Sequence, residues 1–456
     1  MKSYERLQKN KVKIPKQIKY HSKTYLFLSD DSTEAQKDPN VLFLQTKRNA
    51  SYGKTLKENG FDIVDANELK NYFLLTPKII GITGTNGKTT TGAIIYSILL
   101  DMGYKCALLG TRGFFANDEE LKPKGLTTPG ILELYANIEK AALLDCEYFI
   151  MEVSSHAIEQ ERIAGLNFSA KILTNITGDH LDYHKTFEEY IRVKNSFFKD
   201  ESLKIINKDE PKVFFNPKNA YGYALNSKTN LSPTAYSFNE GINAHIFWKE
   251  NHNNPEEAFI DSCLYGVHNL YNILAAIACI KCLTKAPLKT IAKKTENFGG
   301  VSGRMEIVSH DPLIIVDFAH TEDGMKQIFE SFKSKKISVV FGAGGDRDKT
   351  KRPKMGACAY NYAEKIYITS DNPRSEEPNN IIDEIFAGIP KNTTHHIILE
   401  PDRKKAIQQA MNELENNEVL LVLGKGDETY QIIGKENFYF DDREIIKNYI
   451  KQIKPL

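Results

Sequence analysis

The chain has 456 residues, which is more than one hydrophobic core usually supports, so we expect two or three domains. Its 60 Lys and Arg residues balance its 59 Asp and Glu residues, so no net field favours nucleic acid or an anionic membrane as a partner. The six cysteines are scattered without paired or metal-binding spacing, which predicts free thiols in a reducing cytoplasm. Because no signal peptide and no run of ~18 apolar residues is evident, we expect a cytoplasmic protein with no membrane partner.

Residues 1–77 predict a small α/β domain. The apolar runs "TYLFLS", "VLFLQT" and "FDIVDA" have the composition of short strands, and "ASYGKTLKENG" has that of a helix. No phosphate-binding loop occurs in this part of the chain.

Residues 78–308 predict a second, larger domain. The runs "KIIGITG", "KCALLG", "EYFIMEV" and "AKILTNI" alternate with helical patterns and end in polar or glycine residues. This alternation is typical of a largely parallel, doubly wound sheet that binds ligands at the carboxyl ends of its strands. The same pattern restarts with "PLIIVDFAH", so residues 309–456 predict a second doubly wound unit.

The stretch "GITGTNGKTTT" joins a predicted strand to a predicted helix. Its glycines make a turn whose N–H groups face an anion, while Lys88 and Thr89 can reach phosphates and a bound metal ion. Ile82 stands where the strict phosphate-loop pattern has its first glycine, so the loop is a variant. The alternative is a glycine turn that carries a lysine by chance, but the flanking elements favour a nucleoside triphosphate site.

Acidic and histidine residues follow two of the predicted strands. Glu152 ends "EYFIMEV", where a carboxylate can hold the magnesium ion of a nucleotide; the alternative is an ordinary acid at a strand end. Past another strand, "TNITGDHLDYH" brings His180 together with Asp179 and Asp182. These side chains suit several metals, or simple hydrogen bonding at the surface.

Lys194 lies on the apolar face of a predicted helix. In "KTFEEYIRVKNSFF" that face carries Phe187, Tyr190, Ile191, Lys194, Phe197 and Phe198. Such a lysine commonly buries its stem and extends its amine to water. Partial burial also favours the neutral amine, which carbon dioxide can convert to a metal-binding carbamate.

Further candidates lie near the predicted domain junction and on later strand-end loops. Asn269 and Asn272 lie at one helix end in "GVHNLYN", and Arg304 lies in "SGRME". Arg347 and Arg374 follow strands in the last unit, where two guanidinium groups suit the capture of carboxylates. The alternatives are helix caps, a surface arginine and salt bridges within loops.

Taken together, these motifs resemble the Mur ligases, the ATP-dependent amide-forming enzymes of peptidoglycan precursor synthesis. The shared motifs, in chain order, are "GTNGKTT", "LTTP", "EVSSHAIEQER", "TNITGDHLDYH", "HNLYN", "GRME", "VDFAHT", "GGDRDKTKRP", "DNPRSEEP" and "LGKGDETYQ". The resemblance implies three α/β domains. Residues 1–77 would bind the UDP-muramoyl substrate, residues 78–308 would form an ATP-binding, phosphate-loop ATPase-like domain, and residues 309–456 would form a Rossmann-like domain that binds the amino acid.

Within the family, the chain resembles the ligases that extend UDP-N-acetylmuramoyl-L-alanyl-D-glutamate through an acyl phosphate. "DNPR" resembles the form that adds meso-2,6-diaminopimelate rather than L-lysine. The resemblance implies ATP and Mg²⁺ as cofactors, small-molecule substrates, a monomer, and a role in cell-wall growth, cell shape and division. Folylpolyglutamate synthase is a rival that the N-terminal domain and "DNPR" disfavour. A phosphate-loop switch or motor is another, but it has no role for Lys194 or for the arginine loops.

The resemblance also implies roles for particular residues. Those that would hold ATP are Gly84, Thr85, Asn86, Gly87, Lys88, Thr89, Thr90, Asn269, Arg304 and Asp317. Those that would hold two magnesium ions are Thr89, Glu152, His180 and carbamylated Lys194, and the catalytic residues would be Lys88, Lys194 and His180. Those that would contact the nucleotide sugar and its dipeptide are Ser32, Asn49 to Ser51, Thr127, Thr128, Ser154, Gln160 and Arg162. Those that would bind the diamino acid are Arg347, Asp371, Asn372, Pro373, Arg374, Gly424 and Glu428.

Three positions depart from the family pattern. Thr33 replaces an arginine, Leu126 replaces an asparagine before Thr-Thr-Pro, and Asp427 replaces a histidine in "GKGDE". These departures concern substrate contacts and leave the expected reaction class unchanged.

Overall fold

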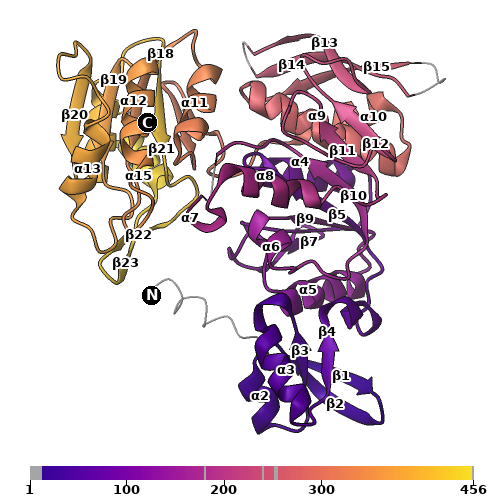
Figure 1. Ribbon diagram of the computed structural model, residues 1–456. Helices are drawn as coiled ribbons and strands as arrows, with labels where there is room; N and C mark the ends of the chain where they lie inside the picture. The colour runs from indigo at the N-terminus through magenta and orange to yellow at the C-terminus, as the bar shows by residue number, and fades with distance from the viewer. Residues whose placement is uncertain (1–12, 179–180, 239–240, 251–254, 454–456) are drawn as a thin grey trace. The chain divides into compact units, whose positions relative to one another are not determined.

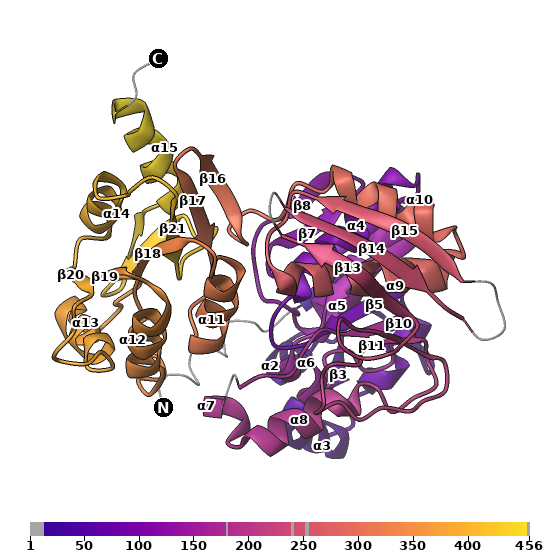
Figure 2. The ribbon, with the colours of Figure 1, turned by 90° about the horizontal axis from the view of Figure 1, so that it is seen from above.

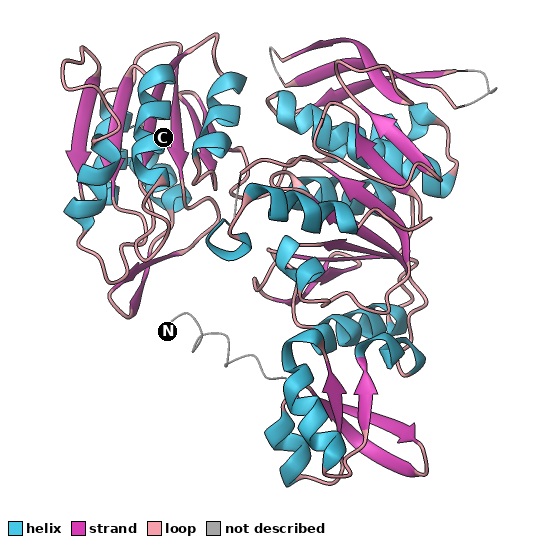
Figure 3. Cartoon of the chain, in the orientation of Figure 1, coloured by secondary structure: helices cyan, strands magenta, loops and turns pink. Residues whose placement is uncertain are grey.

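A computed structural model describes residues 13–178, 181–238, 241–250 and 255–453. The chain divides into two compact units. One contains the residues up to 234 with 245–259 and 271–295, and the other contains 235–244, 260–270 and the residues from 296 onward. Helices and strands alternate through both units (Figure 3), which confirms the predicted α/β class.

A four-stranded sheet opens the first unit (Figure 1). Its strands, in spatial order, are β1 (Lys13–Tyr20), β2 (Lys23–Ser29), β3 (Val41–Gln45) and β4 (Ile63–Asp65), with β1 antiparallel to β2 and the other pairs parallel. Helices α2 (Ser32–Lys37) and α3 (Ala50–Glu58) pack on it through a cluster that includes Val41 and Phe43. Leu42 and Leu44 alternate with these residues and face the cluster that contains Ile131. The three predicted strands are confirmed, and β1 is an addition: its residues are mostly charged or exposed, so it carries little apolar pattern.

An eleven-stranded sheet follows the N-terminal sheet along the chain and is here called the central sheet. Its strand order is β15-β14-β13-β12-β11-β10-β5-β9-β6-β7-β8. The strands are β5 (Lys78–Thr83), β6 (Cys106–Gly110), β7 (Gly113–Ala116), β8 (Glu119–Lys122), β9 (Tyr148–Glu152), β10 (Phe168–Leu173), β11 (Lys204–Asn207), β12 (Ala220–Tyr223), β13 (Leu231–Ser237), β14 (Ile242–Trp248) and β15 (Glu256–Ser262). Neighbouring strands from β12 through β6 are parallel, as the sequence predicts. The edge strands β7 and β8 are antiparallel, which the sequence reading did not anticipate.

Helices cover both faces of the central sheet. Those of this region are α4 (Lys88–Asp101), α5 (Ile131–Leu143), α6 (Ser155–Glu159), α7 (Leu181–His184), α8 (Phe187–Ser196), α9 (Val267–Thr284) and α10 (Leu288–Lys293). Ile79 and Phe149 face the cluster formed with α5 and α8. Ile82 and Ile150 alternate with them along β5 and β9 and lie under Gly92 of α4. The phosphate-loop helix and α8 therefore flank opposite faces of the same strand ends.

A six-stranded sheet forms the core of the second unit, with helices on both faces (Figure 2). Its order is β16 (Glu306–His310), β17 (Leu313–Asp317), β21 (Glu418–Leu423), β18 (Lys336–Phe341), β19 (Lys365–Thr369) and β20 (His396–Glu400). Helices α11 (Glu322–Ser331), α12 (Lys351–Tyr362) and α13 (Pro378–Phe386) cover one face, and α14 (Arg403–Asn412) and α15 (Asp442–Ile453) cover the other. A hairpin of β22 (Tyr430–Ile433) and β23 (Glu436–Tyr439) follows β21.

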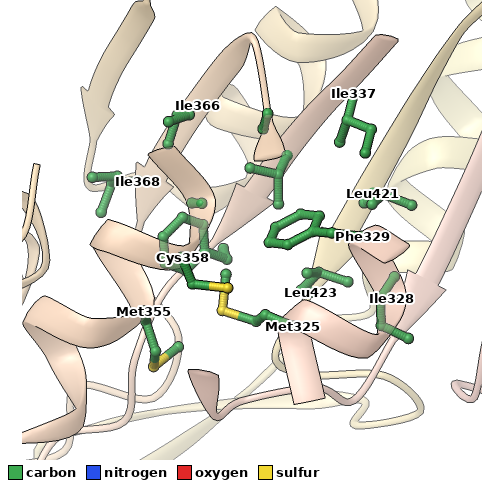
Figure 4. Close-up of a cluster of buried hydrophobic side chains, with 14 of the residues drawn as sticks. Met325, Ile328, Phe329, Ile337, Met355, Cys358, Ile366, Ile368, Leu421 and Leu423 are labelled. Atoms are coloured by element: carbon green, nitrogen blue, oxygen red, sulfur yellow. The ribbon is translucent and has the colours of Figure 1, made fainter. Parts of the chain in front are cut away.

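Alternating residues of this sheet build its two cores. Phe329 and Met325 of α11 pack with Ile366 and Leu421 in one cluster (Figure 4), while Tyr367 and Leu420 belong to the cluster under α14. Since strand side chains alternate with period two, parallel strands that are buried on both faces predict near-continuous apolar runs. The sequence shows such runs in β17, β18, β19 and β21.

The predicted boundary between residues 308 and 309 falls within β16. Because β16 pairs antiparallel with β17, its residues belong to the C-terminal sheet. A boundary before Glu306 is therefore consistent with the strand pairing.

Helix α9 has an unusually apolar composition. Val267–Thr284 is long and apolar enough to cross a membrane by those two criteria, contrary to the expectation that no segment approaches that length. Since 72% of the helix is buried within the structure, its apolar residues pack as those of a core helix do.

Candidate active site

The predicted phosphate loop lies between β5 and α4, as expected, and α4 begins at Lys88. The Lys88 amine donates hydrogen bonds of 2.8 Å to the carbonyls of Gly84 and Thr85. Asn175, which follows β10, braces the loop: its carbonyl accepts from Thr85 N–H and its side chain accepts from Asn86 N–H, both at 2.9 Å. The loop is thus fixed by its own lysine and by the neighbouring strand end.

Glu152 lies at the end of β9 beside this loop, and its side chain is buried. Its carboxylate accepts hydrogen bonds from Thr89 Oγ1 at 3.0 Å, from Thr111 N at 2.9 Å and from Thr111 Oγ1 at 3.2 Å. A carboxylate beside a hydroxyl is the hard oxygen set that Mg²⁺ prefers. The residues present therefore fit a magnesium ion at this position.

The residues predicted to bind the dipeptide continue this hydrogen-bonded network. Thr128 Oγ1 donates to the Glu152 carbonyl at 2.9 Å and accepts from Ser154 N at 3.0 Å. Arg162 NH1 donates to the Thr128 carbonyl at 2.7 Å, and Arg162 NH2 donates to Gln160 Oε1 at 2.8 Å. Burial lowers the pKa of the Arg162 guanidinium from its ordinary value, because it disfavours the charged form. A bound anion would offset that cost.

Thr127 joins the same network through its hydroxyl, which lies 3.0 Å from Thr111 Oγ1. The structure therefore brings together residues from five separate segments of the sequence. In chain order they are Thr89, Thr111, Thr127, Thr128, Glu152, Ser154, Gln160 and Arg162.

Lys194 lies on the apolar face of α8, as predicted, but only 1% of its surface is exposed, so its amine does not extend to water as a lysine on such a face commonly does. Its Nζ lies 4.8 Å from the centre of the Tyr190 ring, and the Tyr190 hydroxyl lies 2.9 Å from Thr85 Oγ1 in the phosphate loop. Lys194 therefore adjoins the loop through one tyrosine. His180 and Asp179 lie outside the described residues.

No cluster of three or more His, Cys, Asp and Glu side chains suited to a metal ion occurs among the residues that the structure describes. The predicted magnesium set is of a different kind, because it includes a threonine hydroxyl and a modified lysine.

The predicted nucleotide-sugar residues lie in the small N-terminal sheet. Ser32 is the first residue of α2, whose N-cap is Asp31. Asn49 Nδ2 donates to the Asp30 carbonyl at 3.0 Å and to the Leu44 carbonyl at 2.9 Å. The segment that begins at Asn49 is thereby tied to the loop that precedes Ser32.

Asn269, Arg304 and Asp317 lie in the second unit. Asp317 is buried, and its carboxylate accepts from the N–H groups of Met305 and Ala319 at 2.7 and 2.6 Å. Burial raises its pKa, while the Arg304 charge opposes the rise. Asn269 Nδ2 donates to the Tyr265 carbonyl at 2.9 Å. Arg304 and Asp317 are thus close enough for the charge of one to act on the other.

The predicted diamino-acid residues gather at the carboxyl edge of the C-terminal sheet. Asn372 Nδ2 donates to Glu428 Oε2 at 2.9 Å. Asp371 follows β19 and lies against Gly424, where an added Cβ would come within 2.8 Å of Asp371 Oδ2. Pro373 is buried behind this edge, and its carbonyl lies against Gly345.

Arg374 has unusual surroundings for an arginine. Its NH1 donates to the Gly345 carbonyl at 2.8 Å, but its Nε is buried with no hydrogen-bond partner among the described residues. Burial, followed by the charge of Arg347, lowers the pKa of Arg374 from its ordinary value. An incompletely paired guanidinium beside a second arginine favours a carboxylate ligand. Arg347 itself is exposed on the neighbouring loop.

Three residues of these sites were missed by sequence reasoning. Thr111 holds Glu152, Asn175 holds the phosphate loop, and Lys425 lies between Asp371 and Glu428. Each follows a predicted strand, so the strand-end rule could have identified Thr111 and Asn175. Nothing in "GKGDE" indicates that Lys425 is buried.

Comparison with known proteins agrees with this geometry. Residues 82–280 match the model of the Mur ligase middle domain, and residues 303–426 match that of the Mur ligase, glutamate ligase domain. The UDP-N-acetylmuramoyl-L-alanyl-D-glutamate--2,6-diaminopimelate ligase of Helicobacter hepaticus is 55% identical over 96% of this chain and 98% of its own length. The enzyme of the same name from Helicobacter pylori is 55% identical over 97% and 100%.

Solved structures give the same result for the fold. A structure of a UDP-N-acetylmuramoyl-L-alanyl-D-glutamate--2,6-diaminopimelate ligase aligns with a TM-score of 0.66 at 25% identity, covering 96% of this chain and 97% of that one. A folylpolyglutamate synthase of Mycobacterium tuberculosis aligns with a TM-score of 0.61 over 79% and 91% at 14% identity, so that likeness concerns the fold alone. From the matched domains and the identity over nearly its whole length, the chain belongs to the Mur ligase family.

Proposed function

We propose that this chain is an ATP-dependent ligase that adds meso-2,6-diaminopimelate to UDP-N-acetylmuramoyl-L-alanyl-D-glutamate in peptidoglycan synthesis. The observation that carries the proposal is the single hydrogen-bonded network from Thr89 through Glu152 to Thr128 and Arg162. It joins a phosphate-loop hydroxyl to residues suited to an anionic substrate. The curated relatives at 53–55% identity, all named as this ligase, support the same acceptor.

The reaction requires that a carboxylate be activated before an amine can attack it. A carboxylate oxygen of the dipeptide attacks the terminal phosphorus of ATP, ADP leaves, and an acyl phosphate forms. The neutral diaminopimelate amine then attacks the acyl carbon, phosphate leaves, the nitrogen gives up a proton, and an amide remains. Lys88 stabilises charge on the transferred phosphate, and Arg162 with Thr128 positions the dipeptide.

Mg²⁺, when bound, supplies positive charge that offsets the repulsion between carboxylate and triphosphate. Glu152 and Thr89 would hold it, together with His180 and a carbamate of Lys194. Asn269, Arg304 and Asp317 would contact ATP alongside the residues from Gly84 to Thr90.

In this proposal each of the three regions of the chain binds a different substrate. The N-terminal region to residue 77 binds the UDP sugar through Ser32 and the segment from Asn49 to Ser51, the region from 78 binds ATP, and the C-terminal sheet, taken from Glu306, binds the amino acid. The enzyme acts as a cytoplasmic monomer on small molecules, without a nucleic-acid or membrane partner. Light scattering during size-exclusion chromatography tests the monomer.

The proposed function is tested by amino-acid-dependent product formation. Purified protein is incubated with ATP, Mg²⁺, UDP-muramoyl dipeptide and meso-diaminopimelate, and the product is identified by mass. We expect one amide bond per ATP hydrolysed, with hydrolysis dependent on both other substrates. A parallel incubation with ATP, Mg²⁺, a folate and glutamate tests the folylpolyglutamate synthase alternative, and ligation in that incubation alone would support it.

Replacing Thr111 with valine is expected to weaken the response to Mg²⁺. Valine keeps the backbone N–H bond to Glu152 but removes the hydroxyl that contacts both Glu152 Oε2 and Thr127. Loss of a group that orients a metal ligand typically costs about 10- to 100-fold in metal affinity or activity. We therefore expect at least about a tenfold rise in the Mg²⁺ concentration for half-maximal ligation. The exposed Thr55→Val is the control, and equal Mg²⁺ curves for both variants would contradict the role.

Replacing Arg374 with alanine is expected to remove the preference for diaminopimelate over L-lysine. Diaminopimelate carries a second carboxylate at its distal end, and a hydrogen bond to a charged group contributes about 1.5–3 kcal/mol. At about 1.4 kcal/mol per tenfold, a bidentate pair predicts a wild-type preference on the order of a hundredfold in kcat/KM. The measurement is kcat/KM for both acceptors in wild type and variant.

The KM values for ATP and UDP-muramoyl dipeptide are expected to stay unchanged in Arg374→Ala. Arg192→Ala is the matched control, because Arg192 is exposed and pairs with Glu189 on α8. Equal use of L-lysine and diaminopimelate by the wild-type enzyme would refute the assignment of Arg374.

A further inference from the structure

Lys425 is a fully buried lysine in the turn that follows β21, and its side chain is 0% exposed. Gly424 and Gly426 on either side have φ angles of +112° and +53°, in the left-handed region that favours glycine. A Cβ on Gly426 would come within 2.6 Å of the Gly303 carbonyl oxygen. The backbone of this turn is therefore tightly constrained around Lys425.

Three oxygen atoms of the diamino-acid residues surround the Lys425 ammonium. They are Asn372 Oδ1 at 3.3 Å, Glu428 Oε2 at 3.5 Å and Asp371 Oδ1 at 3.8 Å. The Tyr430 ring covers another side, with its centre 5.6 Å away. A buried ammonium costs several kcal/mol unless charges and hydrogen bonds compensate it, and here two carboxylates do so. Conversely, Lys425 lowers the repulsion between Asp371 and Glu428.

The same ammonium also helps to fix the orientation of the Asn372 amide. Asn372 Oδ1 accepts from Ile432 N at 2.9 Å and faces Lys425, so its Nδ2 is directed to Glu428. Glu428 Oε1 in turn accepts from the Tyr430 hydroxyl at 3.3 Å. Lys425 thereby contacts three acceptor side chains at this edge, those of Asp371, Asn372 and Glu428.

We propose that Lys425 is a positioning residue that holds Glu428, Asp371 and Asn372 so that they bind the distal ammonium of the diamino acid. The inference rests on the proposed function and adds that different residues recognise the two charged groups at the distal end of the diamino acid. Arg374 recognises the distal carboxylate, and the carboxylates held by Lys425 recognise the distal ammonium. Because Lys425 is fully buried, it acts through these side chains and does not touch the acceptor.

Three acceptors distinguish recognition of the distal carboxylate from recognition of the distal ammonium. Meso-diaminopimelate carries both distal groups, L-lysine lacks the distal carboxylate, and 2-aminopimelate lacks the distal amine. The variants are Lys425→Met, Lys425→Arg and Lys204→Met. Lys204 is the matched control, since it is also fully buried but, among the residues that the structure describes, its amine bonds to backbone carbonyls, those of Ser202 and Lys218.

In Lys425→Met we expect KM for diaminopimelate to rise about tenfold or more, with a smaller change in kcat, because a buried charge pair loses one partner. The ratio of kcat/KM for diaminopimelate to that for 2-aminopimelate should fall toward one. The kcat/KM for L-lysine should fall by the same factor as that for diaminopimelate, because both acceptors carry the distal amine. Lys425→Arg should restore most of the preference. KM for ATP and for UDP-muramoyl dipeptide should stay within about twofold of wild type, as it should in Lys204→Met.

Two results in Lys425→Met would contradict the positioning role of Lys425. An unchanged preference over 2-aminopimelate in Lys425→Met, or a fall in kcat shared by all acceptors without a change in KM, would overturn the assignment of Lys425. If Lys425→Met does not fold, Lys425→Gln removes the charge while keeping a polar side chain, and the same criteria apply. A wild-type enzyme that joins none of the acceptors to UDP-muramoyl dipeptide would instead overturn the proposed function.

Discussion

Lys88→Ala is expected to reduce the ligase kcat on the order of a thousandfold. The lysine begins α4 at the phosphate loop, and its amine lies within 2.8 Å of two loop carbonyls, where it can shift to phosphate oxygens. Loss of one preorganised donor to charge that develops in the transition state typically costs 10²–10³-fold in kcat, about 2.7–4 kcal/mol. The full charge of an ammonium places Lys88 at the upper end of that range.

The loss should come from chemistry rather than from unfolding. Removing two hydrogen bonds within the loop costs about 1–3 kcal/mol of stability, whereas the buried strands around the loop remain intact. Circular dichroism should therefore match wild type, with at most a modest decrease in Tm. Lys105→Ala is the control, since Lys105 is exposed and pairs with the exposed Asp145. Near-normal ligation by folded Lys88→Ala would remove Lys88 from the mechanism.

Lys194→Ala is expected to be nearly inactive, with a loss also near a thousandfold. The motivation is a lysine that is 1% exposed, beside a tyrosine that contacts the phosphate loop. Its neutral amine can attack carbon dioxide, forming an N–C bond and releasing a proton, to give a carbamate that carries negative charge toward Mg²⁺. A bound metal supplies several kcal/mol of charge stabilisation, and about 4 kcal/mol corresponds to a thousandfold.

Two measurements separate a carbamate from an ordinary buried lysine. Acetate or formate added to Lys194→Ala should restore part of the activity by supplying a carboxylate in the vacated space. ¹³C-labelled bicarbonate should give a carbamate signal in the NMR spectrum of the wild-type enzyme that is absent from Lys194→Ala. Lys171→Ala removes another buried lysine of the same unit and is the control. It should keep the carbamate signal, and added acetate or formate should not increase its activity. Full activity of Lys194→Ala would disprove the carbamate.

Local sequence determined the elements and the phosphate loop. Glycine, lysine and threonine in "GTNGKTT" dictate a strand, a turn and a helix that begins at Lys88, because these signals act within a few residues of one another. The helical period likewise placed Lys194 on the apolar face of α8 with Tyr190, although it did not predict that the amine itself is buried. Strand ends identified Glu152 and Arg374, because the carboxyl ends of parallel strands meet at one edge.

Tertiary structure alone decided which of these residues meet. Thr111 and Glu152 are 41 positions apart in the sequence, but they meet because β6 and β9 are neighbours in the sheet. Lys425 is drawn inward between Asp371 and Glu428 by a turn with two left-handed glycines, while its sequence context is that of an exposed loop. The antiparallel edge strands and β1 could not be predicted from local sequence either, because strand pairing depends on partner strands elsewhere in the chain. Propensity and periodicity act over a few residues, whereas the energy of a buried charge depends on every group packed around it.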